Sequence, residues 1–330
     1  MRIALKDPYT APAVSLTALM TTAPVEISIV TPAYKCRECI PELHRRLVEA
    51  LSKLTSSYEL IFVDDASPSG DWDVIEELAR TDPHVRGVKF SRNFGQHFAI
   101  SAGLDRTRGD WVVIMDCDLQ DQPEEIEKLY RKAKEGYDIV LALRQQRKDG
   151  PIKRWFSRWF YRVLEQLTDV KWDSRVGTFR IMSRTVVENF RNMREHLRFF
   201  GGMVQWLGFR TATEEVAHAP RFAGRSSYSL RSMLLLAVRA ILSFSQKPLY
   251  VAVFLGLAIA GISFAMGAYL VVRKIFSGIP VPGWASLMVS FYFMSGLILM
   301  NLGVIGFYVG GIFIETKGRP LYVVDKTVGQ

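Results

Sequence analysis

Residues 109–126 read GDWVVIMDCDLQDQPEEI. An apolar run, WVVIM, ends directly at Asp116-Cys117-Asp118, and a proline with two glutamates follows. A short apolar run bounded by turn-forming residues is typical of a buried strand, and acidic residues suit the first turn of a helix. The stretch therefore predicts a strand, a turn that carries two carboxylates, and a helix over residues 123–136.

The same alternation of strand and helix precedes this stretch and follows it. Further strands are predicted at residues 25–32, 58–63, 85–90 and 138–143. Helices are predicted at residues 40–54, 71–80 and 95–106. Such alternation indicates an α/β fold with a mainly parallel sheet covered on both faces. Polar residues that follow the strands should then meet at one edge of the sheet, where ligands bind: Tyr34, Asp64, Asp65, Asn93, Asp116 and Asp118.

The Asp116-Cys117-Asp118 turn is a candidate metal site. Two carboxylates just past a strand can share Mg²⁺ or Mn²⁺, which prefer oxygen ligands and often bridge protein carboxylates to substrate phosphates. A solvated acidic turn is the alternative. Asp64 and Asp65 are suited to accept hydrogen bonds from a base N–H or a ribose hydroxyl, or one of them caps the next helix.

Two long apolar segments occupy the C-terminal third. Residues 249–272 carry no charge, and neither do residues 285–313. Each is long enough to span a bilayer, and a turn-forming linker separates them. Basic residues are dense before the first segment and recur after the second, which predicts a membrane hairpin with the large domain in the cytoplasm.

The net charge of +9 is compatible with nucleic acid, an anionic membrane or an anionic substrate. Many Arg and Lys residues lie just before the apolar segments, so we expect a membrane and no nucleic acid. Three cysteines are too few for a disulfide framework, and no second Cys/His pair completes a zinc site with Cys36 and Cys39. The sequence therefore predicts reduced thiols in a cytoplasmic domain.

Basic residues near the predicted membrane surface are candidate phosphate ligands. Residues 151–167 mix arginine and lysine with aromatic residues, which favours a helix at the membrane interface. Arg144 and Arg147 follow the fifth predicted strand, and guanidinium groups suit phosphate oxygens. A basic, hydroxyl-rich loop at residues 224–228 could hold a phosphate at the bilayer, and a plain flexible loop is its alternative.

Together these motifs resemble glycosyltransferase family 2, and within it the polyprenyl-phosphate glycosyltransferases. The resemblance runs from about residue 25 to residue 322. It is carried by SIVTPAY, FVDDAS, SRNFGQHFAI, GDWVVIMDCDLQDQPEEI, GTFRIMSR, RFAGRSSYSL and the two apolar segments. It implies a GT-A nucleotide-sugar-binding fold and inverting transfer of a sugar from a nucleotide-sugar to a lipid phosphate.

The resemblance also implies roles for single residues. The nucleotide-sugar would contact Pro32, Tyr34 and Asp64 or Asp65, with its diphosphate near Asp116. Asn93 and Gln96, after the third predicted strand, can also hydrogen-bond the donor, and a plain turn is the alternative for their loop. The metal would be held by Asp116, Asp118 and Gln120. The acceptor phosphate would be bound by Arg144, Arg147, Arg225, Ser226 and Ser227. Asp118, Arg144 and Asp173 are the expected catalytic residues, with Asp173 orienting the acceptor rather than removing a proton. Relatives of this kind often associate, so a homo-oligomer is a further expectation.

Two positions depart from the family pattern. Many members have Asn-Glu where this chain has Lys35-Cys36, which leaves the donor contacts of that loop open. The middle residue of the D-x-D motif is commonly Ala and is Cys117 here. We expect Cys117 to point away from the metal and to have no consequence.

The predicted organisation has five parts. They are a flexible tail (1–24), a cytoplasmic catalytic domain (25–220), a juxtamembrane acceptor loop and amphipathic helix (221–247), two membrane helices (248–314) and a cytoplasmic C-terminal tail (315–330).

UDP-glucose is the favoured donor and undecaprenyl phosphate the favoured acceptor. The alternatives are a GDP-mannose transferase similar to dolichol-phosphate mannose synthase and a non-catalytic membrane protein that binds lipid phosphates. A processive polysaccharide synthase would need more spans than this chain offers.

Overall fold

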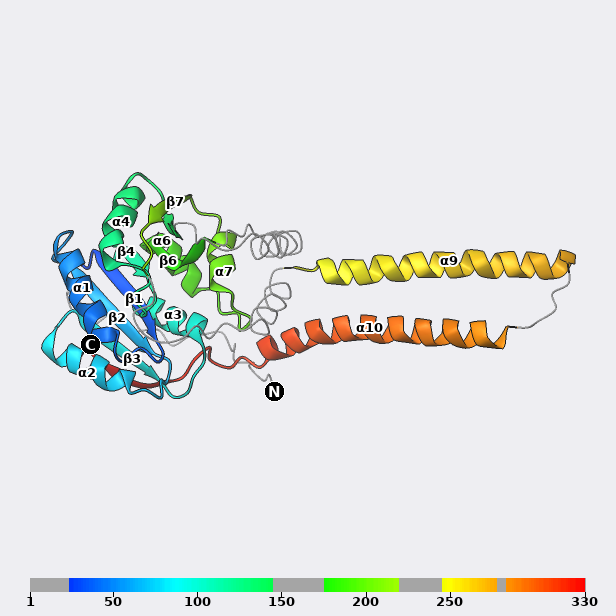
Figure 1. Cartoon of the computed structure of the whole chain (residues 1–330), viewed down its shortest axis with the longest axis horizontal. Helices are drawn as coiled ribbons and strands as arrows, with labels where there is room; N and C mark the ends of the chain where they lie inside the picture. Colours follow the sequence, from blue (N-terminus) through cyan, green and yellow to red (C-terminus); the bar gives the residue numbers. More distant parts are fainter. Residues whose placement is uncertain (1–23, 145–174, 220–244, 278–282, 330) are drawn as a thin grey trace, which may run out of the picture.

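The computed structural model describes residues 24–144, 175–219, 245–277 and 283–329. It confirms the α/β class and the mainly parallel sheet, and it places two long apolar helices beside one another, away from the sheet (Figure 1). The predicted interfacial helix at residues 151–167 and most of the segment 221–247 lie outside the described residues, as do nearly all of residues 1–24.

One eight-stranded sheet forms the centre of the domain, in the order β7-β5-β6-β4-β1-β2-β3-β8. Pairing is antiparallel for β6 with both of its neighbours and for β8 with β3, and it is parallel elsewhere. The strands are β1 (Ile27–Ala33), β2 (Tyr58–Asp64), β3 (Val85–Phe90), β4 (Trp111–Ile114), β5 (Ile139–Arg144), β6 (Val176–Ser183), β7 (Thr211–Val216) and β8 (Val324–Val328).

Helices cover both faces of this sheet, as expected. One face packs against α1, α2 and α4, and the other against α3, α6 and α7 (Figure 1). Their bounds are α1 (Ile40–Ser52), α2 (Asp71–Thr81), α3 (Gln96–Leu104), η1 (Pro123–Glu125), α4 (Ile126–Lys134), α6 (Arg184–Arg191) and α7 (Phe200–Trp206). The predicted helix at residues 123–136 is thus a 3-10 turn followed by α4.

The sequence analysis did not predict the later elements of the domain, namely β6, α6, α7, β7 and β8. Strand β6 lies between β4 and β5, so those two strands are not neighbours. Strand β8, within the predicted C-terminal tail, extends the sheet beside β3. Tyr322 helps to hold this tail, because its ring stacks on Phe90 at 5.1 Å between centroids and its hydroxyl donates to Asp105 Oδ2 at 2.6 Å. The chain therefore returns from the apolar helices into the sheet of the catalytic domain.

The apolar helices are α9 (Lys247–Ser277) and α10 (Trp284–Thr316). Within them, Lys247–Tyr269 and Ser290–Thr316 are long and apolar enough to cross a membrane, and neither window is buried inside the protein. Their large side chains are exposed, up to 81% for Phe264 and 82% for Phe276. A continuous apolar surface of this kind marks an interaction with a membrane or with another apolar partner.

Candidate active site

The carboxyl ends of β1, β2, β3 and β4 bring together the polar loops that the sequence singled out. Gln96, at the start of α3, donates its side-chain amide to Asp116 Oδ1 at 2.7 Å. The backbone N–H groups of Phe94 and Gly95 donate to the Asp65 carboxylate at 2.7 and 2.8 Å. The expectation that residues following separate strands meet at one edge is therefore confirmed for these loops.

Asp64 and Asp65 lie in different environments, although they are adjacent. Both oxygens of Asp65 are used by the loop after β3, which gives this residue a structural task. Asp64 is fully buried, and its Oδ1 accepts the Ser67 N–H at 2.9 Å. Its Oδ2 has no hydrogen-bond partner among the described residues. Of the two, Asp64 therefore keeps acceptor capacity for a ligand.

Burial also changes the acidity of Asp64. Loss of solvent, with smaller contributions from the charges of Asp71 and Asp65, raises its pKa to about 6. Desolvation raises the pKa of Asp65 as well. A buried carboxylate with a raised pKa and a spare acceptor oxygen is a common feature of ligand sites.

The loop after β1 presents Tyr34 and Lys35 to solvent. Tyr34 is 43% exposed, and the Lys35 ammonium lies 5.4 Å from the centre of its ring. Lys35 has a φ of 58° and donates its backbone N–H to Ser67 Oγ at 2.9 Å. Pro32, by contrast, is a buried residue of β1 whose register partner is Val63. Asn93 is exposed in the loop between β3 and α3.

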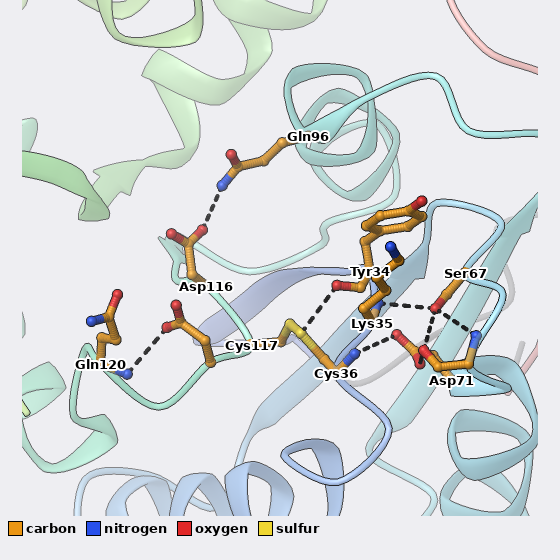
Figure 2. The surroundings of a disulfide bond; sticks show 11 residues. Tyr34, Lys35, Cys36, Ser67, Asp71, Gln96, Asp116, Cys117 and Gln120 are labelled. Carbon is orange, nitrogen blue, oxygen red and sulfur yellow. Dashed lines mark hydrogen bonds between the residues drawn. A yellow bond between two sulfur atoms is a disulfide. The ribbon is translucent and has the colours of Figure 1, made fainter. Parts of the chain in front are cut away.

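The Asp116-Cys117-Asp118 turn follows β4 directly. Leu119 has a φ of 60°, and the Gln120 N–H donates to Asp118 Oδ1 at 3.2 Å, so the turn folds back on itself. In Figure 2 the Asp116 side chain points toward Gln96, whereas Gln120 lies at the other end of the turn. The three predicted metal ligands are therefore on one short turn.

Negative charge accumulates at this turn. Desolvation, followed by the charges of Asp121 and Asp118, raises the pKa of Asp116 to about 7. Arg180 is a buried residue of β6 opposite Ile114, the last residue of β4, and burial lowers its pKa to about 10, so it stays cationic at neutral pH. Crowded carboxylates of this kind are stabilised by a divalent cation, so the donor set fits Mg²⁺ or Mn²⁺ chemically.

Two of the three predicted metal ligands, Asp116 and Asp118, are carboxylates, and the third is the amide side chain of Gln120. Within the described residues, no cluster of three or more His, Cys, Asp or Glu side chains is arranged to hold a metal. Asp116 uses Oδ1 for the bond to Gln96, and its carboxylate has a second oxygen with which it could bind a cation while that bond is kept.

Two further residues of the site were missed by the sequence analysis. Asp121 is 1% exposed and contacts Arg144, whose Nη2 lies 3.3 Å from each carboxylate oxygen. His218 Nδ1 lies 3.4 Å from Asp121 Oδ1, and the same two residues form an isolated β-bridge. Arg144 is thus held beside the acidic turn. A histidine in a loop 97 positions after Asp121 gave no local signal in the sequence.

The predicted acceptor residues are largely outside the described part of the chain. Arg144 is placed, as the last residue of β5. The other members of the predicted set lie outside the described residues: Arg147, Asp173, Arg225, Ser226 and Ser227.

The prediction of reduced thiols is wrong for two of the three cysteines. Cys36 and Cys117 form a disulfide, with their Cα atoms 6.3 Å apart (Figure 2). Parallel pairing of β1 with β4 brings the two following turns together, although the cysteines are 81 positions apart in sequence. The expectation that Cys117 has no consequence is also wrong. The two positions at which the chain departs from the family pattern are bonded to each other.

Comparison with known proteins agrees with this arrangement. The family model "Glycosyl transferase family 2" matches residues 28–191. Over 306 residues the chain is 39% identical to an uncharacterized glycosyltransferase of Bacillus subtilis, covering 92% of this chain and 95% of the relative. Over 304 residues it is 39% identical to the SfII prophage-derived bactoprenol glucosyl transferase of Shigella flexneri, covering 92% and 98%.

Among solved structures, the chain is similar to glucosyl-3-phosphoglycerate synthase from Mycobacterium tuberculosis in complex with Mn²⁺, uridine diphosphate and phosphoglyceric acid. The TM-score is 0.48 at 18% identity, over 66% of this chain and 76% of that chain. The expected GT-A fold, a mixed and mostly parallel sheet with the acidic turn after β4, is confirmed. With relatives 39% identical over nearly their full length, this chain belongs to glycosyltransferase family 2.

Proposed function

We propose that this protein transfers glucose from a nucleotide-sugar, with inversion, to a polyprenyl phosphate at a membrane surface. One observation carries the proposal: the acidic turn and the donor loops share one sheet edge, in a chain that continues into two exposed apolar helices. The bactoprenol glucosyl transferase of Shigella flexneri, which this chain matches over 92% of its length, supports glucose and a polyprenyl acceptor.

The donor is a nucleoside diphosphate glucose, with UDP as the preferred nucleotide. The unpaired Oδ2 of Asp64 is the group that would accept a hydrogen bond from the base or the ribose. The exposed ring of Tyr34 offers an apolar surface next to that position. Asn93 and Gln96 would contact the sugar or the diphosphate from the loop after β3.

The acceptor needs little chemical activation. A phosphate monoester has a second pKa of about 6, so its oxygen is largely ionised near neutral pH. That oxygen forms a bond to the anomeric carbon while the bond from this carbon to the nucleoside diphosphate breaks, and the leaving group keeps the electron pair. A single displacement of this kind inverts the anomeric configuration.

The protein contributes position and charge to this step. Asp116, Asp118 and Gln120 would hold a Mg²⁺ or Mn²⁺ ion, which neutralises the diphosphate as it departs. Arg144, held beside the turn by Asp121, would bind the acceptor phosphate. Arg147, Arg225, Ser226 and Ser227 would complete that phosphate site, and Asp173 would orient the acceptor.

We also propose that α9 and α10 form a hairpin in the inner membrane, with both ends of the hairpin in the cytoplasm. The positive residues that flank the apolar segments support this orientation. Strand β8 supports it as well, because the chain that leaves α10 rejoins the catalytic sheet and must lie on the same side of the membrane.

The test uses the full chain in lipid nanodiscs. Radiolabelled UDP-glucose or GDP-mannose is supplied with undecaprenyl phosphate, with EDTA or with added Mn²⁺. We expect labelled lipid from UDP-glucose, loss of label with EDTA, and recovery with Mn²⁺. Label from GDP-mannose alone would overturn the donor assignment. Absence of labelled lipid with every donor would indicate a non-catalytic binder.

A further inference from the structure

The Cys36–Cys117 disulfide joins the two loops that meet at the proposed donor site. Cys36 follows the exposed Tyr34 and Lys35, in the loop after β1. Cys117 stands between the two carboxylates proposed to hold the metal. No other covalent bond links these loops within the described residues, and Figure 2 shows the sulfur atoms between them. The position of this bond therefore couples the nucleotide side of the site to the metal side.

The loop after β1 is also held from the β2 side by hydrogen bonds. The Cys36 N–H donates to Asp71 Oδ2 at 3.0 Å, and Ser69 Oγ donates to Asp71 Oδ1 at 2.7 Å. Lys35 is held by Ser67. None of these contacts reaches the Asp116–Asp118 turn. Without the disulfide, the loop keeps its attachment to β2 but loses its direct bond to the turn.

The reduced state has contacts available in the same place. Cys36 Sγ lies 3.5 Å from the carbonyl oxygen of Tyr34, so a Cys36 thiol can donate its S–H to that oxygen. Cys117, 5% exposed, would become a buried thiol, which is a common state for this residue type. Reduction therefore loosens the link between the loops without requiring the domain to unfold.

The proposed cytoplasmic side of the membrane is a reducing compartment, where disulfides are usually transient or regulatory. We propose that the Cys36–Cys117 bond is a reversible positioning element. It holds the loop after β1 in a fixed position relative to the Asp116–Asp118 turn, so that reduction of the disulfide weakens donor binding. This inference rests on the proposed function for the identity of the donor.

The reaction partner is a dithiol, such as dithiothreitol or a protein with paired thiols. One of its thiolates attacks a sulfur of the disulfide, and a mixed disulfide forms as the other cysteine leaves as a thiolate. The second thiol of the reagent then attacks the mixed disulfide and frees the remaining cysteine. The protein gains two thiols, and the dithiol becomes a disulfide.

The first measurement is binding of UDP-glucose to the full chain in nanodiscs, with the protein oxidised by diamide or reduced by dithiothreitol. Ordering about one extra residue on binding corresponds to roughly a tenfold loss of affinity. We therefore expect a donor Kd about tenfold higher after reduction and full recovery on reoxidation. In a separate transfer assay with undecaprenyl phosphate, the donor KM should rise by the same factor and kcat should change by less than about twofold. Non-reducing peptide mapping should show the Cys36–Cys117 link only in the oxidised sample.

Three matched variants complete the test. Cys36→Ser and Cys117→Ser should bind the donor as the reduced protein does and should not respond to dithiothreitol. Cys39→Ser, which leaves the disulfide intact, should respond as the wild type does. Equal donor affinity in oxidised and reduced protein would overturn the inference, and so would failure of diamide to form the link. Binding is measured without an acceptor, so failure of transfer alone would count against the proposed function and not against this inference.

Discussion

Large apolar side chains are buried in the catalytic domain and exposed in the α9–α10 hairpin. In the domain, large residues such as Phe62, Phe90 and Phe179 are 1% exposed, whereas in the hairpin Phe264 and Phe276 exceed 80%. The domain buries its apolar side chains in its own core, whereas the hairpin needs a membrane or another apolar partner to cover them. The difference supports the proposed function, in which the donor site is built within the chain and lipid completes the acceptor side.

In the described part of the chain, hydrogen bonds and a strand join the end of α10 to the domain. Glu315, near the end of α10, accepts N–H bonds from His196 and Leu197 of the domain. Tyr308 of α10 donates its hydroxyl to the carbonyl of Ser245, just before α9, at 2.8 Å, so this bond joins the two ends of the hairpin to each other. Strand β8 then fixes the end of the chain to β3.

The largest expected effect concerns the donor side alone. Asp118→Ala removes one of the proposed metal ligands, and we expect transfer to fall by at least about 10³-fold while the hairpin still inserts. Labelled lipid in nanodiscs measures the transfer. Asp110→Ala is the matched control, because Asp110 is an exposed acid at the opposite end of β4. Turnover near the wild-type level in Asp118→Ala would remove the metal role.

The next prediction concerns the hairpin alone. Leu257→Arg places a charge near the middle of the first span, at a side chain that is 64% exposed. A central arginine costs about 3 kcal/mol on insertion scales. We expect a lower fraction of protein to resist alkaline extraction from membranes, and Leu257→Ala should behave as the wild type. Equal extraction of the arginine variant would indicate that α9 does not lie in lipid.

The contact between β8 and the domain should give a smaller effect. Tyr322→Ala removes the stack on Phe90 and the hydrogen bond to Asp105, and we expect a loss of about 2 kcal/mol in the free energy of unfolding of the domain. Tyr322→Phe keeps the stack and should lose about 1 kcal/mol. Chemical unfolding of detergent-solubilised protein measures both. Unchanged stability in Tyr322→Ala would mean that the end of the chain is not held in the sheet.

The smallest effect is a dependence on pH through Asp64. Its pKa in the folded protein, about 6, lies above the ordinary value of 3.8. The folded state therefore binds more protons than the unfolded state between these values, and the stability contributed by Asp64 rises as the pH falls through about 6. Donor binding should change in the opposite direction, because a protonated Asp64 is a poorer acceptor for a ligand N–H.

We expect the affinity for UDP-glucose to fall by up to about tenfold for each pH unit below 6 through this group. The comparison is with Asp64→Asn, since Asp116 also titrates near neutral pH and contributes to both proteins. The variant should bind the donor weakly, lack the part of the pH dependence due to Asp64, and unfold at a higher temperature than the wild type at pH 7. Identical pH profiles would show that Asp64 does not contact the donor.

Local patterns predicted most of the fold. Apolar runs such as the one before Asp116 and the helical spacing of Leu43, Leu47 and Leu51 located elements to within a few residues. Local patterns failed where a strand pairs with another strand that is distant in the sequence. The five residues of β8 form an edge strand whose three central residues, Asp325, Lys326 and Thr327, are all exposed, so no apolar alternation marks it, and its register is set by β3 more than 200 positions earlier.

In the candidate site, too, some features were predicted from local patterns and others were not. Residues that follow strands, such as Asp116, were placed by the parallel sheet and were predicted together. The Cys36–Cys117 bond, the contact between Asp121 and His218, and the different tasks of Asp64 and Asp65 depend on how loops pack, which no local pattern contains.

The most direct test of the account is whether donor cleavage depends on the lipid. Release of UDP from UDP-glucose is followed in nanodiscs with and without undecaprenyl phosphate, for the wild type and for Asp118→Ala. The account predicts release in the wild type only when the lipid is present, in equal amount to the labelled lipid formed, and no release in the variant. Equal UDP release without the lipid, or transfer by the variant, would contradict it.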